Sequence, residues 1–125
     1  MTNLVDQAQR ALGNNVHIGP LGYGCWRLVN MPMADARARI EHVLALGMNL
    51  IDTADVYGLD WGGTAFGSAE ELLGEVLKQA PGLRDQMVLT SKGGIIPGVP
   101  YNSAYLEQAC NDSLQRLGVE CLDLY

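Results

Sequence analysis

The chain has 125 residues, of which 48% are hydrophobic, and a formal net charge of −6. This length fits one domain of about 100–200 residues, and so apolar a composition excludes an intrinsically disordered chain. Fourteen acidic residues against eight basic ones leave no material for the basic patch that binds nucleic acid or an anionic membrane surface, so we expect neither partner.

The cysteines and the first residues indicate the compartment. Cys25, Cys110 and Cys121 are odd in number and show no metal-ligand spacing, which predicts reduced thiols, no metal and no disulfide framework. Residues 1–10 lack the apolar core of a signal peptide. The apolar runs are far shorter than the roughly 20 residues that span a bilayer. The sequence therefore predicts a cytoplasmic protein.

The first half of the chain alternates apolar and amphipathic segments. An apolar stretch over residues 18–25, interrupted by glycines, predicts a strand. Residues 33–46 repeat apolar side chains at intervals of three and four, which predicts a helix capped by Gly47. Residues 49–52 then predict a short buried strand, followed by a loop rich in glycine and aspartate over residues 53–67.

The second half repeats this alternation. A helix is predicted over residues 68–78, with Ser68 as its N-cap and with Glu70, Glu71 and Glu75 on a solvated acidic face. Residues 87–91 predict a strand, and residues 93–100 a Gly/Pro loop. Residues 103–117 predict a helix that ends at Gly118, and residues 121–125 predict a last strand.

This order predicts an α/β fold with a parallel sheet, because the strands start about 30 residues apart, the size of a βαβ unit. If the strands pair in sequence order, every helix covers one face of the sheet and the other face lines a barrel. If the strand order reverses partway, the sheet is doubly wound and helices cover both faces. Periodicity leaves both arrangements open. A closed barrel needs about 250 residues, so the barrel interpretation makes this chain half of one.

Three features fall at the predicted carboxyl ends of the strands, where parallel α/β folds place their active sites. Asp52 ends the second strand and precedes Tyr57, Lys92 follows the third, and Gly24-Cys25-Trp26 follow the first. Lysine is scarce, with only Lys78 and Lys92 in the chain. Taken singly, Asp52 fits a loop cap, Tyr57 a packing aromatic and Lys92 a solvated charge.

Taken together, the tyrosine, lysine and aspartate predict a tuned proton donor. A phenol has a pKa of about 10, and a nearby ammonium group stabilises the phenolate and lowers that pKa. A carboxylate paired with the lysine keeps it charged and oriented. Such a donor suits carbonyl reduction, in which a proton reaches oxygen and a cofactor delivers hydride to carbon.

Five sequence segments, from about residue 18 onward, resemble the aldo-keto reductase superfamily in their order and spacing, in particular its bacterial oxidoreductases. They are Leu-Gly-Tyr-Gly-Cys-Trp at 21–26, Ile-Asp-Thr-Ala-Asp-Val-Tyr-Gly at 51–58, Ala-Glu-Glu-Leu-Leu-Gly at 69–74, Thr-Ser-Lys at 90–92, and Ser-Leu-Gln-Arg-Leu-Gly at 113–118 with Leu-Asp-Leu-Tyr at 122–125. The resemblance implies a (β/α)8 barrel that uses NADPH to reduce aldehydes and ketones.

The resemblance also implies residue roles. Tyr57 would donate the proton, Lys92 would tune it, and Asp52 would pair with Lys92, so the candidate catalytic residues are Asp52, Tyr57 and Lys92. Gly24, Cys25, Trp26 and Asp52 would contact the cofactor, and Trp26 fits equally a substrate-pocket wall or packing at the barrel mouth. The histidine of the family's tetrad is expected just beyond Tyr125, and the strands that hold the adenosine phosphate are expected in the other half.

We therefore expect one incomplete domain over residues 1–125, the N-terminal half of a (β/α)8 TIM barrel with about four parallel strands and three helices. The expected function is NADPH-dependent reduction of a small-molecule carbonyl substrate. The alternatives are a catalytically silent fragment or a subunit that needs a complementary C-terminal half, and a small non-enzymatic α/β binding module. Open strand edges and an uncovered face predict that the isolated chain self-associates or is poorly soluble. The missing half of the barrel predicts that the isolated chain is inactive.

Overall fold

The computed structural model describes residues 8–59 and 65–125. Its strands are β1 (Arg10–Leu12), β2 (Val16–Ile18), β3 (Gly22–Gly24), β4 (Leu50–Asp52) and β5 (Val88–Thr90), and its helices are α1 (Met33–Ala45), α2 (Ser68–Gln79) and α3 (Ser103–Leu117), with 3-10 helices η1 (Cys25–Arg27) and η2 (Pro81–Gln86). The three predicted helices are confirmed to within one residue at each end. In this part of the chain, every helix is too short or too polar to cross a membrane.

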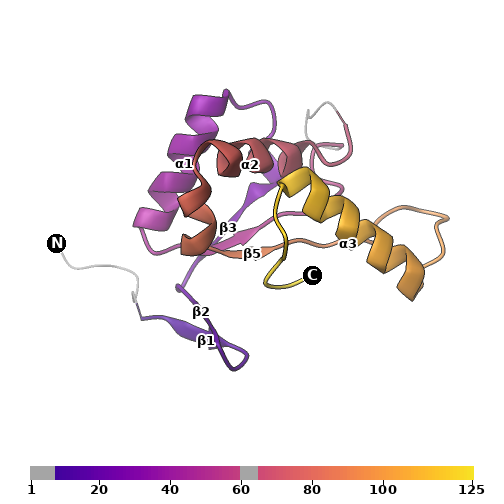
Figure 1. Ribbon diagram of the computed structural model, residues 1–125, viewed down its shortest axis with the longest axis horizontal. Helices are drawn as coiled ribbons and strands as arrows, with labels where there is room; N and C mark the ends of the chain where they lie inside the picture. The colour runs from indigo at the N-terminus through magenta and orange to yellow at the C-terminus, as the bar shows by residue number, and fades with distance from the viewer. Residues whose placement is uncertain (1–7, 60–64) are drawn as a thin grey trace.

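The main sheet is parallel and its strands pair in sequence order, β3 to β4 to β5. Gly24 pairs with Asp52, and Asp52 with Thr90, so the three strands end at one edge, the C-terminal edge of the sheet. Figure 1 shows the helices following one another beside these strands, and α2 packs against both α1 and α3. The sheet order does not reverse, so the fold is a sector of a (β/α)8 barrel and not a doubly wound sheet.

One apolar core joins the helices to the sheet. The helices contribute side chains spaced three or four residues apart, and the buried strand residues Ile51 and Leu89 meet them. The helical members are Ala36, Ile40 and Val43 from α1, Leu73, Val76 and Leu77 from α2, and Leu117 from α3. This core fixes the heights of the strands and therefore the positions of the residues that follow them.

The predicted last strand, residues 121–125, is wrong as a full strand. Only a single parallel bridge joins Leu124 to Thr90. The physical reason lies in the side chain of Asp123. Its carboxylate accepts a hydrogen bond from the Leu89 amide at 2.8 Å and forms an ion pair with Arg84 at 3.0 Å. The Asp123 side chain thus accepts a hydrogen bond from the backbone of β5, where a regular strand pair would use main-chain acceptors.

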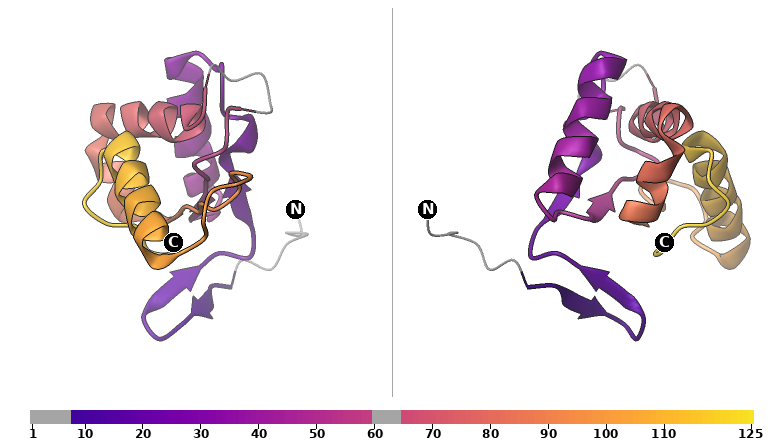
Figure 2. Two further views of the ribbon diagram at one scale, coloured as in Figure 1. Left: turned by 90° about the vertical axis from the view of Figure 1, so that its right-hand side faces the viewer. Right: turned by 60° about the vertical axis from the view of Figure 1, so that its left-hand side comes forward.

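An antiparallel hairpin of β1 and β2 precedes the sheet and was not predicted. It lies at the end of the sheet where the parallel strands begin, as Figure 2 shows. Asn49, which directly precedes β4, accepts from the Gly19 amide at 2.7 Å and donates to the His17 carbonyl at 2.9 Å. The residues Gly13-Asn14-Asn15 between the strands are a three-residue loop containing glycine, which is the signal that could have revealed the hairpin.

The caps of the helices agree in part with prediction. Gly47 follows the C-cap of α1 and Gly118 caps α3, as expected. Ser68 as the N-cap of α2 is wrong: the cap is Gly67, with a φ of +84°, and Ser68 is the first helical residue. A Cβ on Gly67 would lie 2.5 Å from Cδ of Arg116, so a side chain there would displace Arg116.

Candidate active site

Asp52 and Lys92 meet at the C-terminal edge of the sheet. Asp52 is the last residue of β4, and Lys92 follows the end of β5 by two residues. The Lys92 Nζ donates to Asp52 Oδ2 at 2.7 Å and to the Thr53 carbonyl at 3.0 Å. The other Asp52 oxygen accepts from the Thr90 hydroxyl at 2.9 Å. Two neighbouring strands therefore deliver an oriented ion pair, as the sequence predicted.

Tyr57 joins this pair from the turn after β4. The Lys92 Nζ lies 4.8 Å from the centre of the Tyr57 ring. The Tyr57 carbonyl accepts from the Ala69 amide at 3.1 Å, which fixes the turn to the first turn of α2. Gly58, at a φ of +117°, permits this approach, because a Cβ there would lie 2.6 Å from the Ser68 Cβ. The three candidate catalytic residues are thus close together in space.

The surroundings of Lys92 keep it protonated. Burial opposes the ammonium form, but hydrogen bonds with the Asp52 carboxylate and the Tyr57 side chain outweigh burial and raise the pKa of Lys92 above its ordinary value. The Lys92 and Asp52 side chains are 42% and 41% exposed, so a ligand can reach the group. The arrangement can hold a positive charge against the phenol of the half-buried Tyr57.

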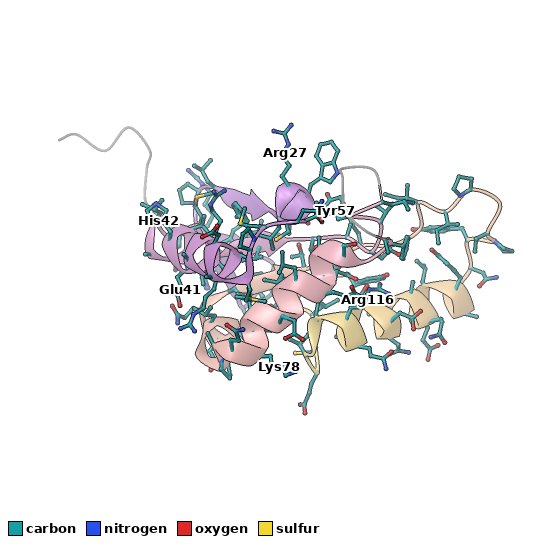
Figure 3. All side chains as sticks on the ribbon, turned by 90° about the horizontal axis from the view of Figure 1, so that it is seen from above. Arg27, Glu41, His42, Tyr57, Lys78 and Arg116 are labelled. Atoms are coloured by element: carbon teal, nitrogen blue, oxygen red, sulfur yellow. The ribbon has the colours of Figure 1, made fainter. Side chains whose placement is uncertain are left out.

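The end of β3 places an open surface beside Tyr57. Trp26 is 44% exposed and its ring centre lies 6.5 Å from that of Tyr57. The Arg27 guanidinium lies 6.0 Å from the Trp26 ring. In the view of Figure 3, the labels of Arg27 and Tyr57 stand on the opposite side of the molecule from that of Lys78. Nothing lies within 4 Å of a Cβ built on Gly24. A flat ring can therefore approach the backbone here.

Cys25 differs from its neighbours. Its side chain is fully buried in the apolar core, and burial, with the nearby Asp52 charge, raises the pKa of the thiol to about 12. The whole residue is 0% exposed, so Cys25 anchors the backbone between Gly24 and Trp26 to the core.

Glu70 does not lie on a solvated face, and that prediction is wrong. The Glu70 side chain is fully buried; its Oε2 accepts from Arg116 Nε at 2.7 Å, and its Oε1 accepts from the Ser91 hydroxyl at 2.5 Å. The sequence carried a signal for this burial: Glu70 precedes Leu73 by three residues and Leu77 by seven, which places it on the apolar stripe of α2.

Asp55 is a second buried carboxylate behind the site. It is 2% exposed, and its Oδ1 has no hydrogen-bond partner among the described residues. Burial, and to a lesser extent the Glu70 charge, raises the pKa of Asp55. Its amide donates to the Lys92 carbonyl at 3.1 Å, so it binds the segment that carries the lysine.

The described residues thus form a sector of an α/β barrel with a tyrosine, a lysine and a carboxylate at its strand ends. The sequence profile described as Aldo/keto reductase family matches residues 20–125, so the chain belongs to that family. Two similar curated proteins are named 6-dehydroglucose reductase. The protein of Novosphingobium aromaticivorans is 46% identical over 123 residues, and that of Agrobacterium fabrum is 34% identical over 128 residues.

These matches cover 94% and 91% of this chain but 40% and 41% of the two relatives. The solved structures agree. An aldo-keto reductase of Bacillus halodurans, described as its holo form, superposes with a TM-score of 0.72 at 32% identity, over 96% of this chain and 39% of that one. A Pseudomonas aeruginosa protein described as a putative aldo-keto reductase gives 0.72 at 29% identity, over 91% and 44%. The chain thus spans about two fifths of the length of its relatives.

Proposed function

We propose that this chain carries the proton-donating part of an NADPH-dependent reductase of small aldehydes and ketones. The observation that carries the proposal is the Lys92 ammonium group, held at 2.7 Å from the Asp52 carboxylate and 4.8 Å from the centre of the Tyr57 ring. An aspartate-paired lysine beside a reachable phenol suits the protonation of a carbonyl oxygen.

In the proposed reaction, Tyr57 donates its hydroxyl proton to the carbonyl oxygen of the substrate. The Lys92 ammonium stabilises the negative charge that the phenol oxygen gains, and Asp52 keeps Lys92 protonated and oriented. A bound nicotinamide cofactor supplies the hydride that reaches the carbonyl carbon. The partial exposure of the lysine and aspartate lets substrate in.

The end of β3 fits the nicotinamide end of such a cofactor. Members of the family generally use NAD(P)H. The open backbone at Gly24 and the Asp52 carboxylate would hold the ring beside Tyr57, with the buried Cys25 fixing the backbone after Gly24. The exposed Trp26 ring would border both the cofactor and the substrate. The preference for NADPH comes from the resemblance and is part of the proposal.

Oxidised sugars are the proposed substrates, since both curated relatives are named 6-dehydroglucose reductase. The Trp26 face beside Tyr57 is flat and apolar, and sugar rings pack on such faces through their C–H groups. The Arg27 guanidinium near that ring can donate hydrogen bonds to sugar hydroxyls. Trp26 and Arg27 would thus orient the sugar while Tyr57 protonates its carbonyl.

Turnover is proposed to need the remaining strands of the barrel, because the chain spans 40% of the Novosphingobium relative. The test is complementation. This chain is mixed with the part of that relative that the chain does not match, together with NADPH and 6-dehydroglucose, and nicotinamide absorbance is followed.

We expect NADPH oxidation by the mixture and none by either part alone. Tyr57→Phe should lower kcat by about 100-fold or more, the usual contribution of a positioned acid, whereas Tyr101→Phe, at an exposed tyrosine, should not change kcat. Turnover by the verified chain alone would refute the need for a complementary half. Full activity with Phe at position 57 would refute the role of Tyr57.

A further inference from the structure

A buried ion pair lies behind the C-terminal edge of the sheet and touches no part of the proposed substrate surface. Glu70 on α2 is fully buried and Arg116 on α3 is 19% exposed. The Arg116 guanidinium also reaches the Ser113 hydroxyl at 3.4 Å and lies 5.6 Å from the Phe66 ring. Figure 3 shows Arg116 where α2 and α3 pack together. The pair therefore belongs to the packed contact between α2 and α3.

Ser91 connects this pair to the site. It stands between Thr90, the last residue of β5, and Lys92, and it is 4% exposed. Its hydroxyl donates to Glu70 Oε1 at 2.5 Å, and its amide donates to the Leu124 carbonyl at 3.2 Å. Ser91 is thus held on two sides, by α2 and by the C-terminal segment, directly before Lys92.

The same turn of α2 holds the segment that carries Tyr57. The Ala69 amide donates to the Tyr57 carbonyl, and the next residue along the chain is Glu70, which binds Ser91. A further bond runs from the Asp55 amide to the Lys92 carbonyl at 3.1 Å and joins the two segments directly. Two consecutive residues of one helix thus hold the two segments whose side chains must meet.

We propose that Glu70 is a positioning residue, which acts through Ser91 to hold Lys92 against Asp52 and Tyr57, while Arg116 holds the Glu70 side chain in place. This role rests on the proposed function, since it serves the proton-donating group. Glu70 touches neither substrate nor cofactor in this scheme. Loss of the Glu70–Ser91 bond lets the lysine segment shift, and a shift of about 1 Å is enough to impair a reaction that depends on orientation.

The test uses the reactivity of Lys92, which does not depend on turnover. The chain contains two lysines, and Lys78, with its side chain 77% exposed, serves as an internal reference. The chain is labelled briefly at neutral pH with an acylating reagent, and mass spectrometry gives the ratio of label at Lys92 to label at Lys78. Only the neutral amine reacts, so a lysine that loses its contacts with Asp52 and Tyr57 becomes more reactive.

In Ser91→Ala we expect this ratio to rise about threefold or more, since each unit of pKa changes the neutral fraction tenfold. Ser103→Ala is the control: Ser103 is exposed and is the first residue of α3, at the opposite end of that helix from Arg116. Its ratio should not change. An unchanged ratio in a folded Ser91→Ala chain, or an equal rise in both variants, would overturn the proposal.

If Ser91→Ala fails to fold, as judged by circular dichroism, the double variant Glu70→Leu/Arg116→Met carries the test. It removes the acceptor of Ser91 together with its cation, and apolar replacement of a whole buried pair is often tolerated. The labelling ratio should rise as in Ser91→Ala, and an unchanged ratio would refute the role of Glu70.

A second readout separates this inference from the proposed function. In the complemented reductase, Ser91→Ala should lower kcat about tenfold while KM stays within twofold, because orientation and not binding is lost. If the parent shows no turnover but the labelling ratio still rises in Ser91→Ala, the proposed function fails and the positioning of Lys92 stands. If the parent turns over and the variant matches it in both measurements, the positioning role fails alone.

Discussion

The molecule contains two ion pairs with the same separation and opposite surroundings. Lys92 and Asp52 are joined at 2.7 Å with side chains that are 42% and 41% exposed, and Arg116 and Glu70 are joined at 2.7 Å with side chains that are 19% and 0% exposed. The contact distance alone does not reveal what each pair does. Access to water distinguishes a pair that can meet a ligand from one that can only hold its neighbours.

The difference follows from the energetics of charge. Exposed pairs contribute little to stability because water and salt screen them. A buried pair is balanced only while both partners are present, since a single charge left in the interior is costly. We therefore expect Asp52–Lys92 to affect chemistry more than stability, and Glu70–Arg116 to affect stability first.

The largest expected effect is that of Glu70→Ala, which leaves the Arg116 cation without its carboxylate. The free energy of unfolding should fall by about 3–5 kcal/mol, measured by urea denaturation. The control is Glu75→Ala on the same helix, at a side chain that is 56% exposed, where the change should stay within about 0.5 kcal/mol. Similar losses in the two variants would contradict the distinction between the buried and the exposed pair.

An intermediate effect is expected for Gly58→Ala, where the Tyr57 turn meets α2. Alanine at a φ of +117° is strained, and its Cβ would lie 2.7 Å from the Ala65 carbonyl oxygen. The expected loss is about 1–3 kcal/mol, with a drop in reductase activity because Tyr57 moves. Gly82→Ala, with open space around its Cβ, is the control. A Gly58→Ala chain with unchanged stability would show that the turn adapts.

The smallest effect on stability is expected for Lys92→Met, which breaks the exposed pair. The free energy of unfolding should change by no more than about 1 kcal/mol, while proton donation by Tyr57 in the complemented enzyme should slow by about 100-fold. Lys78→Met should change neither quantity. A stability loss as large as that of Glu70→Ala would show that the exposed pair is structural after all.

The contribution of Lys92 to stability should also depend on pH in a defined direction. Its pKa is raised in the folded chain, so its stabilising effect is complete below its ordinary value of 10.5 and is lost as the pH rises through the higher folded value. The stability difference between the parent and Lys92→Met should therefore shrink above pH 10.5. Urea denaturation from pH 8 upward measures it, and a difference that grows with pH would contradict the assignment.

The sequence was most informative where a local pattern determines structure. The helices follow from the spacing of their apolar side chains, and the glycines after α1 and α3 mark their ends. The grouping of Asp52, Tyr57 and Lys92 was predicted by their places after consecutive strands, because parallel strands in sequence order bring these positions to one edge.

The remaining features depend on contacts that are distant in sequence. The apolar stripe of α2 signalled the burial of Glu70, but its partner Arg116 lies 46 residues away, and no local rule pairs the two. Ser68 looked like a helix cap, yet its hydroxyl bonds to the backbone of Ala65 and Gly67 takes the cap position against Arg116. The last strand was reduced to one bridge because the Asp123 side chain bonds to β5, which is a tertiary contact.

The amide side chain of Asn49 stabilises the end of the sheet opposite the candidate active site. It fastens the hairpin and the entry to β3 at the end where the strands begin, while all the candidate chemistry lies where they finish. Labels, attachment points or stabilising changes introduced on the hairpin would consequently leave the reactive groups undisturbed. The two ends can be engineered independently of each other.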